Sequence, residues 1–538
     1  KQDVLKSKKR KTTSNLRKNM KDMMYKYVLH FAVIILLAML SVKALASDIE
    51  EVIVIGANIS NGYSNPETDS SLIEALDPTR IYQPGGLGGF VGATPNGTDV
   101  KHTTVYRNGI PVNDPGSGWY DFGTETPTFQ TLKMISGPNS ALYGSSSMAG
   151  TILMEDNFDG NNFFTKAGDG LFYVQGGTES WHLSRYKGSN GSVKTDNNEE
   201  DWFENVTLKT KTEVGNWKVI NVLQDYSYDY DSCYDSSFAK VNTCTQEGVK
   251  SDLSIRNDWF TAGYSLNDVK HNTGWSAKSE RYFVDANKEV YKNLILGIQN
   301  QREYYDDKSD YHTSFYANYN TELFGFGYRY EEDQHIYRVG HSHNGWNIVL
   351  ANSFRKPNLY ERYGDDWTKA NPNLQPEKGD GMEASYGDVT AWYYEFSNGI
   401  DYNFATSSYV NIGSYDSKGI KYAKHILMDK GALHVFVQYT DSDRIRVPKY
   451  KTKISYYAGT YTGIDYMLSY VGQWDKGLEF DGRPIDDVNS FNFNMGYNLT
   501  PRYRVGFQVR DIFNRDFEIL PDYRAGGREI SLSLDLSL

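Results

Sequence analysis

The stretch that decides the fold is SGPNSALYGSSSMAGTI, at residues 136–152. Gly137, Gly144 and Gly150 allow positive φ or close backbone packing at tight turns, and Pro138 stiffens the first of these turns. Tyr143 can bury its ring while its hydroxyl keeps a hydrogen-bond partner. These residues predict a compact, turn-rich segment and carry no catalytic chemistry of their own.

A second stretch, NGIPVNDP at residues 108–115, follows a run that predicts a short strand at residues 103–106. Together the two stretches resemble the plug domain of TonB-dependent receptors. In that family a short strand leads into a D/N-G-x-x-V-N-D-P turn, and a later strand runs into R-G-P-x-S-A-L-Y-G. The resemblance implies a plug at residues 58–157. Ser136 stands where the family commonly has Arg, which removes a cation that often pairs with acidic residues of the barrel.

Residues 158–538 show the period-2 alternation of β-strands, broken by Asn, Asp and Gly turns. We expect the apolar face of each strand to meet lipid and the polar face to line a lumen. The length fits an antiparallel transmembrane β-barrel of about 22 strands, and also one of about 16 strands with longer loops. The two clearest apolar series are Phe491, Phe493, Met495, Tyr497 and Leu499, and Ile530, Leu532, Leu534, Leu536 and Leu538.

The composition of the 538-residue chain agrees with a barrel. Its 43 Tyr, 25 Phe and 10 Trp suit the aromatic girdles at the two membrane interfaces. The mean hydropathy is low, and only one apolar run, near the N-terminus, approaches the ~20 residues of a membrane-spanning helix. A large soluble all-β protein would have a similar composition.

Two barrel segments extend the family resemblance. SFRKPNLYERYG at residues 353–364, followed by NPNLQPEK, is similar to the family's mid-barrel hairpin, and Glu377 and Glu383 are expected to face the lumen. The last 30 residues resemble its final hairpin, with Tyr523 and Arg528 at a Y-x-x-x-G-R turn. The sequence ends in Leu538, where the family usually has Phe.

Residues 1–46 predict an upstream extension and a secretory signal peptide. Initiation is expected at a methionine between residues 20 and 24, ahead of an apolar run at residues 28–40 and an A-x-A cleavage site at residues 44–46. A membrane anchor is the alternative. Because this segment is basic, its removal leaves the chain more acidic than the overall net charge of −12. Such a charge argues against nucleic-acid binding.

Directly after the expected cleavage site stands DIEEVIVIGA, at residues 48–57. It looks like a TonB box, which we place at residues 47–57. The resemblance implies that this segment pairs with an edge strand of TonB, which acts with ExbB and ExbD. The expected TonB-binding residues are Asp48, Ile49, Glu50, Glu51, Val52, Ile53, Val54 and Ile55.

The resemblance implies a receptor in the outer membrane of a Gram-negative bacterium that actively imports a scarce nutrient. The PNLYERYG and NPNLQPEK segments are most like the cobalamin-receptor branch. Cobalamin or another metal chelate is therefore the expected substrate, with a ferric siderophore as the alternative. The turns at residues 85–92 and 111–120 are the expected apical loops of the plug. The expected substrate-binding residues are Asn113, Asp114, Trp119 and Tyr120.

The two cysteines, Cys233 and Cys244, both lie beyond the signal peptide, and export permits a disulfide between them. Free thiols are the alternative. Asp229, Asp231 and Asp235 lie in the same loop, and carboxylates are ligands for Ca²⁺. The resemblance to cobalamin receptors implies calcium in an external loop near this position. A solvated acidic loop without calcium is the alternative, because it would have the same sequence pattern.

Other functional classes fit less well. No Ser-His-Asp set, HExxH motif or Cys/His metal pattern is visible, so we do not expect an enzyme. His341 and His343 are expected in an external loop and not in a metal site. A passive porin or an adhesin is the second alternative, but a porin needs an open lumen, which a plug would fill.

Overall fold

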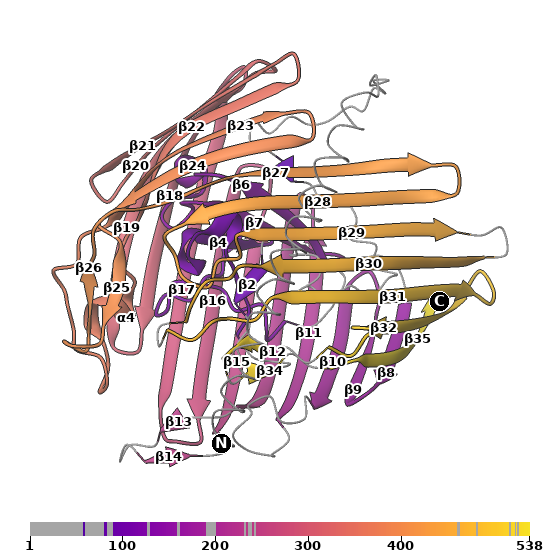
Figure 1. Cartoon of the computed structure of the whole chain (residues 1–538). Helices are drawn as coiled ribbons and strands as arrows, with labels where there is room; N and C mark the ends of the chain where they lie inside the picture. Colours follow the sequence, from indigo (N-terminus) through magenta and orange to yellow (C-terminus); the bar gives the residue numbers. More distant parts are fainter. Residues whose placement is uncertain are drawn as a thin grey trace, which may run out of the picture. The chain divides into compact units, whose positions relative to one another are not determined.

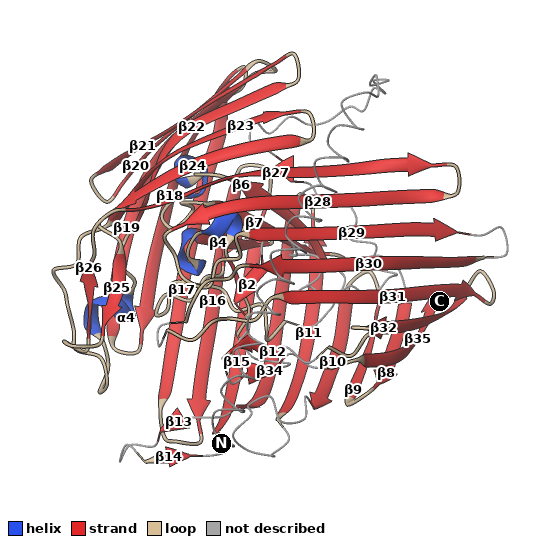
Figure 2. Cartoon of the chain, viewed as in Figure 1, coloured by secondary structure: helices blue, strands red, loops and turns tan. Residues whose placement is uncertain are grey.

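The computed structural model describes residues 58–59, 80–82, 90–125, 130–158, 162–189, 201–230, 233–234, 239–241, 244–459, 463–479, 482–515, 518–521, 523–524 and 527–537. Strands make up most of them, and the helices are short (Figure 2). None of the helices in these segments is long and apolar enough to cross a membrane. All of the described residues belong to one unit, Val54–Leu538.

Twenty-two strands of the described chain close into one antiparallel barrel. The last strand pairs with the first, so the ring has no free edge. This confirms the predicted barrel and the larger of the two strand numbers. The strands are β8 (Asn162–Gly168), β9 (Leu171–Gly177), β10 (Trp181–Ser189), β11 (Trp202–Val214), β12 (Trp217–Tyr230), β15 (Cys244–Arg256), β16 (Phe260–His271), β17 (Ser276–Tyr291), β18 (Leu294–Tyr305), β19 (Lys308–Asn320), β20 (Phe324–Glu331), β21 (Gln334–His343), β22 (Trp346–Arg355), β23 (Glu377–Tyr386), β24 (Val389–Ser397), β27 (Tyr415–Met428), β28 (Gly431–Ser442), β29 (Tyr450–Gly459), β30 (Ile464–Trp474), β31 (Val488–Asn498), β32 (Tyr503–Arg510) and β35 (Glu529–Ser537).

The barrel strands separate apolar from polar side chains as their alternation predicts. On β35, Leu532 is 64% exposed on the outer face, whereas its neighbour Ser531 is 6% exposed and faces the lumen. An outer surface of this kind suits lipid. Other strands present exposed apolar side chains in the same way, among them Leu183, Leu223, Val249, Leu296, Phe326, Val339, Leu350 and Ile420.

The two ends of the barrel differ in the length of their connections. At one end the turns are short, such as Asn344-Gly345, where φ values of 50° and 80° fit a type I′ hairpin. His341 and His343 lie at this end, on β21, so their expected place in an external loop is wrong. The other end carries the long loops, with α4 (Leu359–Tyr363) and the hairpins β13 (Cys233–Tyr234)–β14 (Lys240–Val241), β25 (Ile400–Asn403)–β26 (Ser408–Asn411) and β33 (Glu518–Leu520)–β34 (Tyr523–Arg524).

A second sheet, formed before the barrel begins, makes up the plug. Its strand order is β1 (Asn58–Ile59), β6 (Gln130–Ser136), β7 (Gly150–Asp156), β4 (Thr103–Arg107) and β5 (Ile110–Pro111). A separate hairpin pairs β2 (Arg80–Tyr82) with β3 (Gly92–Ala93), and two 3-10 turns, η1 (Pro95–Gly97) and η2 (Val100–His102), precede β4. In Figure 1 the indigo strands β4, β6 and β7 are framed by barrel strands, and plug residues hydrogen-bond to strands from β11 to β28.

The stretch at residues 136–152 forms the connection between β6 and β7. Gly137 and Gly144 have φ of 85° and 83°, and the short helix α3 (Ser140–Tyr143) lies between them. A Cβ atom on Gly137 would lie 3.0 Å from the carboxyl carbon of Glu383, on β23. Glycine therefore lets the plug backbone approach the barrel wall here. Glu377 and Glu383 are both buried on the lumen side of β23, as predicted, and there they contact His102 and Ser136.

Candidate ligand-binding site

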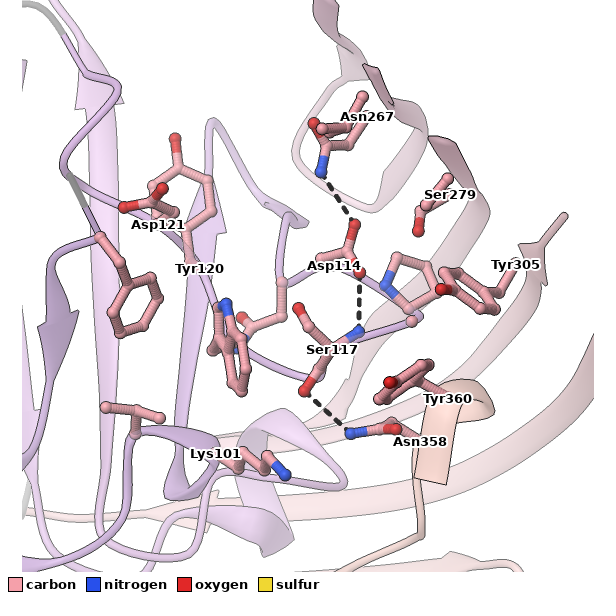
Figure 3. Close-up of a pocket in the computed structure, with 18 of the residues that line it drawn as sticks. Lys101, Asp114, Ser117, Tyr120, Asp121, Asn267, Ser279, Tyr305, Asn358 and Tyr360 are labelled. Carbon is pink, nitrogen blue, oxygen red and sulfur yellow. Dashed lines mark hydrogen bonds between the residues drawn. The ribbon is translucent and has the colours of Figure 1, made fainter. Parts of the chain in front are cut away.

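A cavity of about 1270 Å³ lies between the plug and the long-loop end of the barrel. Its walls include the plug loop at residues 112–121, the loop that carries α4, the β25–β26 hairpin and residues 444–447. Figure 3 shows its central part, with Asp114 and Ser117 between Tyr120 on one side and Tyr305 and Tyr360 on the other. The volume exceeds the roughly 300–1,000 Å³ of ordinary small-molecule pockets, so it can accept a large ligand.

The plug loop at the floor of the cavity is a tight turn attached to the barrel on two sides. Asp114 Oδ1 accepts a hydrogen bond from the backbone N–H of Ser117 at 2.8 Å, and its Oδ2 accepts one from Asn267 Nδ2 of β16 at 3.0 Å. Asn358 Nδ2, at the start of α4, donates to the carbonyl oxygen of Ser117 at 2.8 Å. These bonds fix the floor before any ligand arrives (Figure 3).

The four predicted substrate-binding residues all border this cavity, but they differ in what they offer a ligand. The amide of Asn113 is committed to the plug backbone: its Oδ1 accepts from the N–H of Val105 at 2.7 Å, and its Nδ2 donates to the carbonyl of Thr103 at 2.9 Å. The hydroxyl of Tyr120 donates to Glu125. Asp114 and Trp119 are only partly buried, so they are the better candidates for ligand contact.

Aromatic side chains from the long loops form much of the remaining wall, and sequence reasoning missed them. Their rings pack against one another: Tyr305 lies edge-on to Tyr360 at 6.0 Å, and Tyr360 lies edge-on to Tyr409 at 6.0 Å. The only signal in the sequence was the high aromatic content of the barrel loops, which does not say which loop folds inward. The aromatic residues that line the cavity from these loops and strand ends are Tyr226, Tyr228, Trp275, Tyr305, Tyr360, Trp367, Tyr402, Phe404 and Tyr409.

Two of the cations at the cavity wall, Lys101 and Arg444, are held by carboxylates. Lys101 Nζ lies 2.7 Å from Glu361 Oε1 of α4, and Arg444 pairs with Asp99 of the plug. Burial would lower the pKa of Lys101, but Glu361 raises it above its ordinary value. Burial would likewise raise the pKa of Asp99, but Arg444 and its neighbours hold the pKa of that carboxyl below its usual range. Both pairs are therefore charged at neutral pH.

Away from the cavity, a group of buried charges joins the plug to the barrel. Asp156 of β7 lies at its centre: Arg107 Nε is 2.9 Å from its Oδ2, and Lys209 Nζ of β11 is 2.5 Å from its Oδ1. Arg107 also contacts Glu125 at 3.4 Å. All four side chains are almost inaccessible to solvent, so the plug and wall meet through compensated charge.

Ser136, which stands where the family that the sequence resembles commonly has Arg, links the plug to two charged wall residues, Glu383 and Lys421. Its Oγ donates to Glu383 Oε1 at 2.6 Å, and Asn96 Nδ2 donates to the same oxygen at 3.1 Å. Lys421 Nζ lies 3.3 Å from Ser136 Oγ. Glu383 therefore has hydrogen-bond partners in the plug although residue 136 is Ser and not Arg.

Cys233 and Cys244 form a disulfide with a Cα–Cα distance of 6.0 Å, and Cys233 borders the cavity. Asp229 accepts a hydrogen bond from Thr245 Oγ1 at 2.8 Å. Asp231 and Asp235 lie outside the described residues, so the suggested calcium site stays a prediction. The described part of the chain contains no group of three His, Cys, Asp or Glu able to hold a metal ion. The expected TonB box at residues 47–57 also lies outside the described residues.

The sequence matches no family model, but the fold is shared with solved structures. The ferric enterobactin receptor PfeA of Pseudomonas aeruginosa has a TM-score of 0.66 at 13% identity, covering 88% of this chain and 97% of that one. The siderophore receptor PirA of Acinetobacter baumannii has a TM-score of 0.63 at 12% identity, covering 85% and 94%. The copper transporter OprC has a TM-score of 0.63 at 14% identity, covering 88% and 96%. At such identities the similarity shows the fold alone, a closed 22-stranded barrel like that of these two receptors and this transporter.

Proposed function

We propose that this chain is a TonB-dependent outer-membrane receptor that binds a metal chelate from outside the cell and imports it actively. The observation that carries the proposal is the large cavity between the plug and the long loops of a closed barrel. Transmembrane barrels have short periplasmic turns and long extracellular loops, so the cavity would open to the outside. The plug argues against a passive porin, because its buried contacts with the wall occupy the lumen.

A ferric siderophore is the better supported substrate, and cobalamin is the second candidate. The proteins with similar folds named above bind or transport siderophores or copper, whereas the cobalamin expectation rests on two short motifs. In this chain those motifs form α4 and its flanks, which build one wall of the cavity. They are structural here and do not identify a ligand.

Transport would draw on TonB, with ExbB and ExbD as its partners in the inner membrane. The segment at residues 48–55 would add as a strand to TonB, and a pull on it would rearrange the plug. Binding would therefore occur at one end of the plug and force would be applied at the other. No covalent chemistry is required.

Uptake of labelled ferric siderophores and of labelled cobalamin in a receptor-null host tests this function. Val52→Pro removes a backbone N–H that strand pairing needs, so we expect it to abolish uptake. Val52→Thr keeps the N–H and a β-branched side chain, and we expect near-normal uptake from this control. Uptake that survives Val52→Pro would contradict the TonB-dependent mechanism, and uptake of cobalamin alone would reverse the order of substrates.

A further inference from the structure

We infer that the cavity selects chelates of neutral or positive net charge and rejects polyanionic ones. The inference rests on the proposed receptor function and names the substrate class of the same site. Its starting point is the charge of the wall: among the described residues, four basic side chains and seven carboxylates line the cavity. The basic residues are Lys101, Lys250, Arg444 and Arg446, and the acidic ones are Asp99, Asp114, Asp121, Asp252, Asp365, Asp366 and Asp401.

The basic side chains are already engaged by the protein. Lys101 pairs with Glu361, and Arg446 Nε lies 2.7 Å from Glu479 Oε2. Arg444 contacts both Asp99 and Asp401. These three cations therefore have their charge balanced before a ligand binds.

Lys250 is held without an ion pair in the described chain, and two hydrogen-bond partners hold its ammonium. Its ammonium donates to Thr124 Oγ1 at 2.6 Å and to the carbonyl oxygen of Asp121 at 3.3 Å. It lies over the rings of Tyr120 and Tyr226, at 5.1 and 5.6 Å from their centroids. An anionic ligand would have to compete with these bonds for a single ammonium group.

Three of the lining carboxylates, Asp114, Asp365 and Asp366, have no such compensation. Asp114 accepts from a backbone N–H and from Asn267, and Asp365 Oδ1 accepts from the backbone N–H groups of Trp367 and Thr368, each at 2.8 Å. Within the residues that the structure describes, no basic side chain forms an ion pair with Asp114, Asp365 or Asp366. The uncompensated charge of the lining residues is therefore mainly negative, and like charges brought together across an interface cost affinity.

The aromatic wall supplies an attraction that does not depend on negative charge. Tyr305, Tyr360, Trp367 and Tyr409 line the cavity with aromatic surface for the organic shell of a chelate, and aromatic rings also attract cations. Three catecholate dianions around ferric iron leave a complex with three negative charges. Three hydroxamate monoanions leave a neutral complex, and a protonated amine on the ligand makes it cationic. The cavity therefore suits the hydroxamate class.

Binding to the purified receptor in detergent tests the inference without TonB. The probes are a neutral ferric trihydroxamate, a ferric trihydroxamate with a protonated amine, and a trianionic ferric tricatecholate, each titrated by quenching of tryptophan fluorescence and by calorimetry. We expect the two hydroxamates to bind at least about tenfold more tightly than the tricatecholate at low ionic strength. Added salt should narrow the difference. A tricatecholate that binds as tightly as the hydroxamates, or a failure of both hydroxamates to bind, overturns the inference.

The double variant Asp365→Asn, Asp366→Asn tests the role of the uncompensated carboxylates. Asparagine keeps an acceptor for the N–H groups of Trp367 and Thr368, so the turn should persist. We expect the cationic chelate to lose about three- to tenfold in affinity while the neutral one changes little. The control is Asp307→Asn, at the same end but outside the cavity, where Lys308 lies 2.7 Å away. Equal losses for both chelates overturn the electrostatic assignment.

Failure of this inference is distinguishable from failure of the receptor function. TonB-dependent uptake of the tricatecholate, blocked by Val52→Pro, would keep the receptor and remove the charge selection. If the receptor shows the charge preference in detergent but Val52→Pro does not reduce uptake, the charge selection stands and the TonB-dependent mechanism is wrong.

Discussion

Asp156 is the residue at which the plug and the barrel wall depend most directly on each other. It accepts from Arg107 of the plug and Lys209 of the wall, and Asn108 Nδ2 donates to it at 2.7 Å. Burial would raise its pKa, but Arg107 and Lys209 hold the pKa of this carboxyl well below its ordinary value. A carboxyl whose folded pKa is depressed stabilises the fold above its unfolded pKa and loses that effect as the pH falls through the folded value. The contact should therefore persist from neutral pH to about pH 4 and weaken only in stronger acid.

Asp156→Asn should destabilise the receptor because it leaves Arg107 and Lys209 buried with less compensation. Removing one partner of a buried ion pair costs about 3–5 kcal/mol. Thermal unfolding in detergent measures the loss. The control is Asp388→Asn, at an exposed turn where Lys424 lies 2.6 Å away, and there the expected cost is below about 1 kcal/mol. Similar melting temperatures for the two variants would contradict a structural role for the buried charge.

Trp119 is the predicted ligand residue whose side chain is least committed elsewhere. Its ring lies 5.2 Å from that of Phe90 in an edge-on arrangement, and Lys101 Nζ lies 5.6 Å from its centroid. Trp119→Ala should reduce chelate affinity by about tenfold, since a stacked aromatic contributes roughly 0.5–1.5 kcal/mol beyond its buried area. Titration against the wild type gives the value. Trp346→Ala, at the short-turn end, is the matched control, and an equal loss there would mean that the effect is not local.

At the scale of elements, the decisive contact joins α4 to the floor loop. Asn358 Oδ1 accepts from the N–H of Glu361 at 2.7 Å, and Glu361 Oε2 accepts from the N–H of Asn358 at 3.0 Å, which completes a capping box. The same Asn358 donates through Nδ2 to Ser117 in the plug. A Cβ on Gly118 would lie 2.9 Å from that Nδ2, so the glycine keeps the two elements close. One side chain thus fixes both the helix start and the plug loop.

Asn358→Ala should loosen this wall and weaken binding of every chelate alike. Loss of an N-cap costs about 1 kcal/mol. Asn358→Ser separates the two roles, because serine can cap the helix but cannot reach Ser117. Hydrogen exchange at residues 358–364 should rise in the alanine variant only, whereas chelate affinity should fall in both. Normal affinity in Asn358→Ser would show that the contact with the plug loop is dispensable.

For the whole molecule, the features that could be predicted from the sequence are those that depend on local residue patterns. Alternation at β31 and β35 predicted the barrel and its outer face, and the glycines of residues 136–152 predicted the plug turn. The site was predicted only in part, because Tyr305, Tyr360 and Tyr409 come from separate loops and meet through tertiary folding. Alternation also could not show that the polar side-chain atoms of Asn113 and Tyr120 form their hydrogen bonds within the plug. The expected external-loop position of His341 and His343 was wrong, because the sequence of a two-residue turn does not show at which end of the barrel the turn lies.

The arrangement of the whole chain predicts that the barrel is closed to solutes until the plug moves. The ring is completed by the pairing of β35 with β8, so it does not need the plug to close. The full chain in liposomes should therefore pass no small sugars, and Val52→Pro should leave it equally closed. A barrel lacking residues 58–157 should pass them without saturation, once its heat-modifiable mobility on a gel has shown that it folds. Entry through the full chain at the rate of the plugless barrel would mean that the plug does not block the lumen, and the passive porin would then replace the active receptor.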